Sequence, residues 1–173
     1  MTSQITRRTA LPILGAMGLA ALAPPASSHA SRDNESQQQA ATFAGTWTYR
    51  GFLSNPDINV GFDKLEFASA TLIIDQAPQG VLRGRLTFDS DFLALKGNVS
   101  YGNPFTMRFQ GRGATPATQG WIYDYLGFLV PGWPDGVEQR PAIVGSVIRT
   151  APHSDGKAKA GVVASFVAVK RDS

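Results

Sequence analysis

The chain has 173 residues, 43% of them hydrophobic, which is enough for a globular core, and it contains no cysteine. The absence of cysteine excludes disulfide bonds, thiolate metal sites and cysteine nucleophiles. The formal net charge is +3, but the first thirty residues hold two arginines and no acidic residue, so the remainder has 14 basic against 13 acidic side chains. This near-neutral balance, without a basic stripe, argues against a nucleic-acid partner.

Residues 1–30 have the pattern of a cleavable export signal. Arg7-Arg8 forms a basic start, residues 10–23 are moderately apolar, and Ser28-His29-Ala30 places small residues where a signal peptidase cuts. The apolar stretch is shorter than the about 20 residues that a membrane-spanning helix needs. The arginine pair resembles a twin-arginine signal, although that pattern prefers Phe where Ala10 stands; an ordinary secretory signal is the alternative. We therefore expect an exported bacterial protein, periplasmic or secreted, with no membrane span in the mature chain.

Residues 31–42 are polar and poor in apolar side chains, which predicts a disordered linker. Residues 43–173 are a run of eight short β-type segments without a convincing helix, and turn residues at 77–80 and 102–104 predict hairpins. This pattern favours an all-β fold, an eight-stranded antiparallel up-and-down β-barrel, because closure removes exposed strand edges. A β-sandwich is the alternative.

Several segments alternate apolar and polar residues, as a strand with one face on a core does. In residues 105–112 every odd position is apolar or glycine and every even position is polar. Residues 65–76 change phase near Ser69, which predicts a β-bulge. Gly84, Gly97 and Gly111 lie on the apolar faces of their segments, and inward glycines favour a small, strongly coiled barrel over a flat sheet.

The last three segments have a different pattern. Residues 121–130, 141–150 and 161–169 are apolar on both faces, apart from Asp124 in the first. A barrel strand with one face in water should not have this composition. We therefore predict that these three segments form the interface of a homo-oligomer; burial on both faces inside a sandwich is the alternative.

Gly45-Thr46-Trp47, near the start of the first strand, resembles the G-x-W opening that lipocalins and the avidin/streptavidin family share. The short meander and the apolar late strands are more similar to avidin, whose tetramer uses its late strands. The resemblance covers residues 43–172 as a layout and implies a calycin-type, eight-stranded barrel. Where the streptavidin pattern places Asn and Ser after this Trp to bind biotin, the chain has Tyr49 and Leu53, so we expect a ligand other than biotin.

Residues 121–125 are the most suggestive local group. Strand alternation places Trp121, Tyr123 and Tyr125 on one face and Asp124 on the other. An inward Asp124 would be a buried carboxylate that needs a partner, for which Arg140 or a tyrosine of the barrel interior is a candidate. A structural Asp–Arg pair, or an Asp124 that faces outward, is the alternative.

Residues 130–141 form the longest rigid-looking loop, in which prolines flank Trp133. Such a tryptophan at a barrel mouth can act as a lid over a ligand, and residues 54–62 can share that mouth. The alternative is a tryptophan that plugs the barrel end or packs on a neighbouring subunit. For His153 we expect a solvated loop, because one imidazole beside Ser and Asp neighbours makes neither a metal site nor a triad.

The sequence therefore predicts an exported β-barrel that binds a small apolar or aromatic ligand, without a metal or cofactor. One alternative is a barrel enzyme of cyclase or isomerase type, with Asp124, Tyr125 and Arg140 as its acid–base residues. Another is an accessory subunit of a co-exported enzyme, docked through the late strands. The candidate ligand-binding residues are Trp47, Tyr49, Trp121, Tyr123, Asp124, Trp133 and Arg140.

Overall fold

The computed structural model describes residues 43–171, apart from residues 76, 78, 79, 101, 103 and 131. The predicted signal peptide (residues 1–30) and linker (residues 31–42) lie outside the described residues. Among those that are described, no helix is long and apolar enough to cross a membrane.

Eight antiparallel strands form one closed barrel, in which each strand pairs with its neighbours in sequence and β8 returns to β1. The prediction of an eight-stranded antiparallel barrel is confirmed, and the β-sandwich is excluded. Short 3-10 helices, η1 (Phe62–Leu65) and η3 (Pro116–Thr118), lie in two of the connections. The strands are β1 (Gly45–Leu53), β2 (Glu66–Asp75), β3 (Val81–Phe88), β4 (Asp91–Ser100), β5 (Thr106–Gly113), β6 (Ile122–Leu129), β7 (Ala142–Arg149) and β8 (Val163–Lys170).

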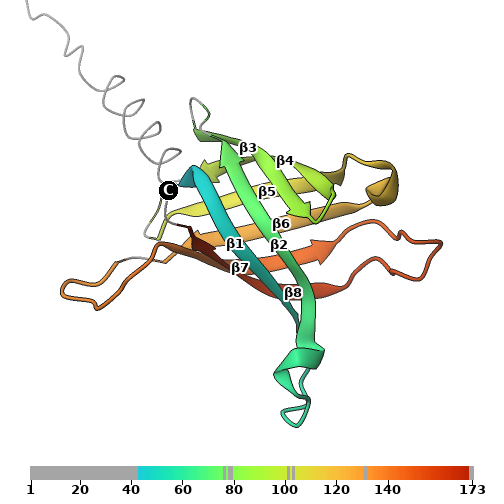
Figure 1. Ribbon diagram of the computed structural model, residues 1–173, viewed down its shortest axis with the longest axis horizontal. Coiled ribbons are helices and arrows are strands. Elements are labelled where there is room, and N and C mark those ends of the chain that lie inside the picture. Colours follow the sequence, from blue (N-terminus) through green and yellow to red (C-terminus); the bar gives the residue numbers. More distant parts are fainter. Residues whose placement is uncertain are drawn as a thin grey trace, which may run out of the picture.

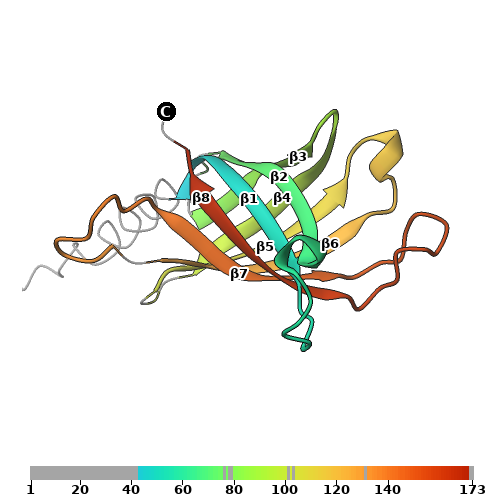
Figure 2. The ribbon, with the colours of Figure 1, turned by 60° about the horizontal axis from the view of Figure 1, so that its bottom comes forward.

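The order of the strands sends successive connections to opposite ends of the barrel (Figure 1). The β1–β2, β3–β4, β5–β6 and β7–β8 connections share one end, which we call the mouth end. The β2–β3, β4–β5 and β6–β7 connections share the other, which we call the closed end. The orange β6–β7 loop and the red β7–β8 loop project from opposite ends in both Figure 1 and Figure 2.

Phe43 and Trp47 fill the closed end, and neither side chain has exposed surface. The indole Nε1 of Trp47 donates a hydrogen bond of 3.0 Å to the backbone oxygen of Phe43. The ammonium of Lys170 lies 5.4 Å from the centroid of the Trp47 ring. The Gly-Thr-Trp segment therefore supplies a core residue that seals this end of the barrel.

Glycine is required where neighbouring strands approach most closely. A Cβ atom on Gly97 would lie 2.0 Å from the backbone oxygen of Arg108, and one on Gly145 would lie 2.0 Å from that of Leu126. Both distances are far below a van der Waals contact, so no larger residue fits without a shift of the backbone. The inward position of Gly97 thus belongs to a small closed barrel, as the sequence pattern predicted.

The change of phase in β2 is a β-bulge, but it lies two residues before the predicted position. Gly51 pairs with Ala68 and the next residue, Phe52, pairs with Glu66. Phe67, and not Ser69, is therefore the additional residue. The bulge directs Phe67 into the barrel, where its ring lies 6.3 Å from that of Tyr123.

The apolar composition of β6, β7 and β8 arises from an apolar outer face in addition to the buried inner one. Val144, Ile148 and Val163 are 41%, 37% and 48% exposed. Ile148 pairs with Val163, so their side chains lie together on the outside of the barrel. We call the outward residues Leu126, Phe128, Val144, Ile148, Val163 and Val167 the outer apolar face.

Candidate ligand-binding cavity

A cavity of about 460 Å³ occupies the mouth end of the barrel. This volume lies within the range of small-molecule sites, which begins at about 300 Å³. Aromatic side chains from strands β1, β2, β3 and β6, and from the residue before β6, form much of its wall: Tyr49, Phe67, Phe88, Trp121, Tyr123 and Tyr125. Polar side chains from the mouth-end connections, the start of β4 and the end of β7 form its rim: Asp89, Ser90, Asp91, Thr118, Arg149 and His153.

The aromatic rings contact one another around Tyr123. Its ring centroid lies 6.3 Å from that of Trp121, in an edge-to-face arrangement, and 6.5 Å from that of Tyr125. Tyr125 in turn stacks on Phe109, with centroids 4.4 Å apart and planes 5° from parallel. Rings that hold each other in this way present a preformed aromatic wall, which lowers the entropic cost of binding.

The β5–β6 connection is held by Thr118, which is 1% exposed. Its Oγ1 accepts hydrogen bonds of 3.1 Å from the backbone N–H groups of Ala114 and Thr115, and it donates one to the backbone oxygen of Phe92. The N–H of Trp121 donates to the backbone oxygen of Thr118 at 3.0 Å. This network fixes the point from which Trp121 enters the cavity wall.

A chain of hydrogen bonds crosses the rim of the cavity. Nε of Arg149 donates to Oη of Tyr123 at 3.2 Å, and that oxygen lies 2.7 Å from Nε2 of His153. Nδ1 of His153 lies 2.9 Å from Oγ of Ser154. The imidazole also stacks on Trp121, with centroids 4.2 Å apart.

The order of donors in this chain assigns the tautomer of His153. Because Arg149 can only donate, Oη of Tyr123 accepts from it and directs its own proton to Nε2 of His153. Nε2 is then the unprotonated nitrogen, and Nδ1 carries the proton that faces Ser154. Burial, and secondly the charge of Arg149, lower the pKa of His153, which favours this neutral form.

Two further phenol groups lie deeper in the cavity. Tyr49 is 1% exposed and Tyr125 is 5% exposed, and their ring centroids are 6.4 Å apart. Burial raises the pKa of both hydroxyls well above the usual value for tyrosine, and the neighbouring tyrosines raise it further. Both groups are therefore protonated at any physiological pH and can donate a hydrogen bond.

The structure brings three of the predicted ligand-binding residues together. Tyr49, Trp121 and Tyr123 line the cavity, as does Tyr125, which we named only as a candidate acid–base residue. Trp47 does not line it, because its side chain is packed in the closed end.

Trp133 and Arg140 lie in the β6–β7 loop at the closed end, so the interpretation of this loop as a lid over the cavity is wrong. Loops 54–62 and 130–141 were expected to share a mouth, but they project from opposite ends of the barrel. The connections of an up-and-down barrel alternate between its two ends along the chain, which places the β1–β2 and β6–β7 loops at different ends. Trp133 is 74% exposed, and Gln139 bonds both its backbone N–H and its backbone oxygen.

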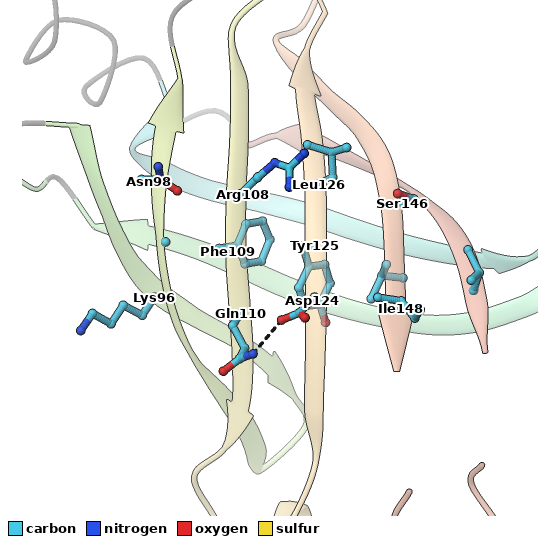
Figure 3. A pocket seen from close by; sticks show the side chains of 13 residues that line it. Lys96, Asn98, Arg108, Phe109, Gln110, Asp124, Tyr125, Leu126, Ser146 and Ile148 are labelled. Atoms are coloured by element: carbon cyan, nitrogen blue, oxygen red, sulfur yellow. Dashed lines mark hydrogen bonds between the residues drawn. The ribbon is translucent and has the colours of Figure 1, made fainter. Parts of the chain in front are cut away.

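Asp124 faces outward, so the outward alternative is correct and Asp124 is not a carboxylate inside the barrel. Its Oδ1 accepts a hydrogen bond of 2.8 Å from Nε2 of Gln110 on β5 (Figure 3). The two residues lie in a hollow of about 440 Å³ on the outer wall, which Lys96, Arg108 and Ile148 also line. Asp124, Tyr125 and Arg140 therefore do not meet: the first lies outside the barrel, the second inside it, and the third in the β6–β7 loop.

Sequence reasoning missed His153 and Arg149, which both belong to the cavity rim. The prediction of a solvated loop for His153 holds for residues 154–157, which are exposed, but not for the imidazole, which is half-buried and contacts Tyr123 and Trp121. The loop is folded back by reciprocal backbone hydrogen bonds between His153 and Ala158, at 3.0 and 3.2 Å. The place of residue 153 in the chain could have indicated that it lies near the cavity, because it follows β7 at the end of the barrel at which β6 begins.

No group of three or more histidine or carboxylate side chains that could hold a metal ion is found in the described part of the chain. A scan against protein-family models finds no match, and a search of the curated proteins finds no significant similarity. The cavity itself is therefore the basis for the function.

Proposed function

We propose that the protein is an exported β-barrel that binds a small aromatic or apolar molecule in the cavity at its mouth end. The observation that carries this proposal is the cavity of about 460 Å³ with its aromatic wall and polar rim. Apolar walls supply affinity, and a small number of fixed polar groups orient the ligand. The pattern of a signal peptide in residues 1–30 supports export to the periplasm or the exterior.

The geometry supports binding better than cyclase or isomerase chemistry. The acid–base set suggested by the sequence is not assembled, since Asp124 bonds Gln110 on the outer wall. The rim group of Arg149, Tyr123 and His153 is already satisfied by its own hydrogen bonds. Its clearest effect is to hold the β7–β8 loop beside the cavity.

Self-association through the outer apolar face is a second part of the proposal. Val144, Ile148 and Val163 are all more than one-third exposed on adjacent strands. Ser146 and Ser165 pair between Val144 and the Ile148–Val163 pair, and exposed apolar side chains grouped this closely on a monomer are characteristic of a protein contact. Size-exclusion chromatography with light scattering tests this part: we expect a homo-oligomer that dissociates in Ile148→Lys, and a wild-type monomer would contradict it.

Tryptophan fluorescence tests the binding site. In Trp133→Phe, Trp121 at the cavity and Trp47 in the closed end remain as reporters. Titration with 2-acetonaphthone should change the emission of Trp133→Phe. It should leave unchanged the emission of Trp121→Phe, which retains Trp47 and Trp133. An equal change in both variants would place the probe outside the cavity and contradict the proposal.

A further inference from the structure

The hydroxyls of Tyr49 and Tyr125 are polar groups in a largely apolar part of the cavity. Among the described residues, neither hydroxyl has a hydrogen-bond partner in the protein, whereas that of Tyr123 has two. Both side chains are more than nine-tenths buried, and both line the cavity. Their capacity to donate is therefore directed at whatever occupies the cavity, whether water or a ligand.

The packing of the two tyrosine rings indicates that their hydroxyls are present to donate hydrogen bonds and not to fill space. Tyr49 stacks on Phe166 at 5.3 Å, and Tyr125 stacks on Phe109 at 4.4 Å (the latter pair is visible in Figure 3). Each ring is thus held on one side by a phenylalanine. A phenylalanine at either position would supply the same packing area, so the hydroxyls are not needed to fill space.

We propose that the cavity selects aromatic ligands that carry a neutral carbonyl oxygen, which accepts hydrogen bonds from the hydroxyls of Tyr49 and Tyr125. This inference rests on the proposed binding function and names the chemical class of the ligand. The aromatic part of the ligand would lie against the wall at Trp121 and Phe88, towards the mouth.

A carbonyl matches this environment better than a charged group. Its oxygen has two lone pairs, and two fixed O–H donors can satisfy both. Arg149 is the one cationic group among the lining residues that could pair with a carboxylate, and it already donates to Tyr123 and to the backbone oxygen of Lys159 at 3.0 Å. The carboxylates that could pair with an ammonium, Asp89 and Asp91, lie at the rim and not beside Tyr49 and Tyr125. Ketones, aldehydes, quinones and lactones with an aromatic ring are members of the proposed class.

The test compares two probes of similar shape, 2-acetonaphthone and 2-isopropylnaphthalene, of which only the first has an acceptor oxygen. We expect the full chain to bind the ketone more tightly. We expect Tyr49→Phe and Tyr125→Phe each to weaken ketone binding by about five- to tenfold, the value of one hydrogen bond, and to leave binding of the hydrocarbon within twofold. The infrared C=O band of the bound ketone should shift to higher frequency in both variants.

A matched control is Phe109→Leu, which disturbs the stacking of Tyr125 but leaves its hydroxyl in place. This variant should weaken the two probes equally. If the tyrosine variants also weaken the binding of both probes equally, or if neither variant weakens the binding of the ketone, the carbonyl proposal is overturned while the binding site stands. If neither probe binds to the wild-type chain, the proposed function itself fails, and the two failures are thus distinguishable.

Discussion

The hydroxyl of Tyr123 lies 2.7 Å from Nε2 of His153, although thirty residues separate the two in the chain. The contact joins the inner face of β6 to the β7–β8 loop, which the red segment of Figure 2 shows at the end of the barrel. Arg149 donates to the same oxygen from the end of β7. One phenol oxygen therefore holds together three separate parts of the mouth.

Removal of this oxygen should destabilise the protein. Tyr123→Phe leaves Nε of Arg149 and Nε2 of His153 without their shared partner, and we expect a loss of about 1–2 kcal/mol in the free energy of unfolding. Urea denaturation measures the change. Tyr125→Phe is the matched control: it removes a hydroxyl without a protein partner and should cost less than about 0.5 kcal/mol. Equal losses would contradict the assigned network.

Stability should fall in weak acid because of His153. Burial and Arg149 lower its pKa below the ordinary 6.5, so the unfolded chain takes up the proton first as the pH falls. The contribution of the neutral imidazole to the free energy of unfolding is thus fully present above about pH 6.5. It is lost as the pH falls through the pKa of His153 in the folded state.

The measurement is the urea midpoint of wild type and His153→Gln between pH 5 and pH 7.5, a range that extends below and above the ordinary histidine pKa. The difference between the two proteins should be larger at the upper end and should narrow at the lower end. A difference that grows as the pH falls would mean that the charged imidazolium is the stabilised form.

Gly145 should not tolerate a methyl group. A Cβ atom there would lie 2.0 Å from the backbone oxygen of Leu126, so β6 and β7 would have to separate, at a cost on the order of 3 kcal/mol. The control is Gly132→Ala, where the nearest atom to the added carbon would lie 3.7 Å away. Thermal unfolding of the two variants measures the difference, and comparable melting temperatures would contradict the close strand approach.

Asp124 should have no part in ligand binding. Asp124→Asn changes a side chain on the outer wall and weakens one contact with Gln110, so the affinity for 2-acetonaphthone should remain within twofold of wild type. Its effect on the free energy of unfolding should stay within about 0.5 kcal/mol, as for other surface changes. A tenfold loss of affinity would place Asp124 in the site after all.

The alternation of apolar and polar residues is a local property, and it was sufficient to predict the eight strands and the closed barrel. It also placed Tyr123 and Tyr125 on one face and Asp124 on the other. Once the tyrosines face the cavity, Asp124 must face outward, so this part of the site could be predicted in full.

The position of Trp133 could also have been predicted, because the connections alternate between the two ends of the barrel, and this alternation places the β6–β7 loop at the end opposite the β1–β2 loop. The role of His153 could not. Its environment is set by contacts with Trp121 and Tyr123 across the barrel mouth, and no local pattern encodes the fold of a β7–β8 loop over a neighbouring strand.

If a small aromatic molecule binds inside the mouth of the barrel, two matched substitutions should differ in their effect on its affinity. Ala68 lines the cavity, whereas Ala94 lies exposed on the outer face of β4. Titration calorimetry with 2-acetonaphthone should show that Ala68→Phe, which fills the cavity, abolishes binding, while Ala94→Phe binds as wild type does. Undiminished binding by a folded Ala68→Phe would show that the molecule does not bind inside the mouth.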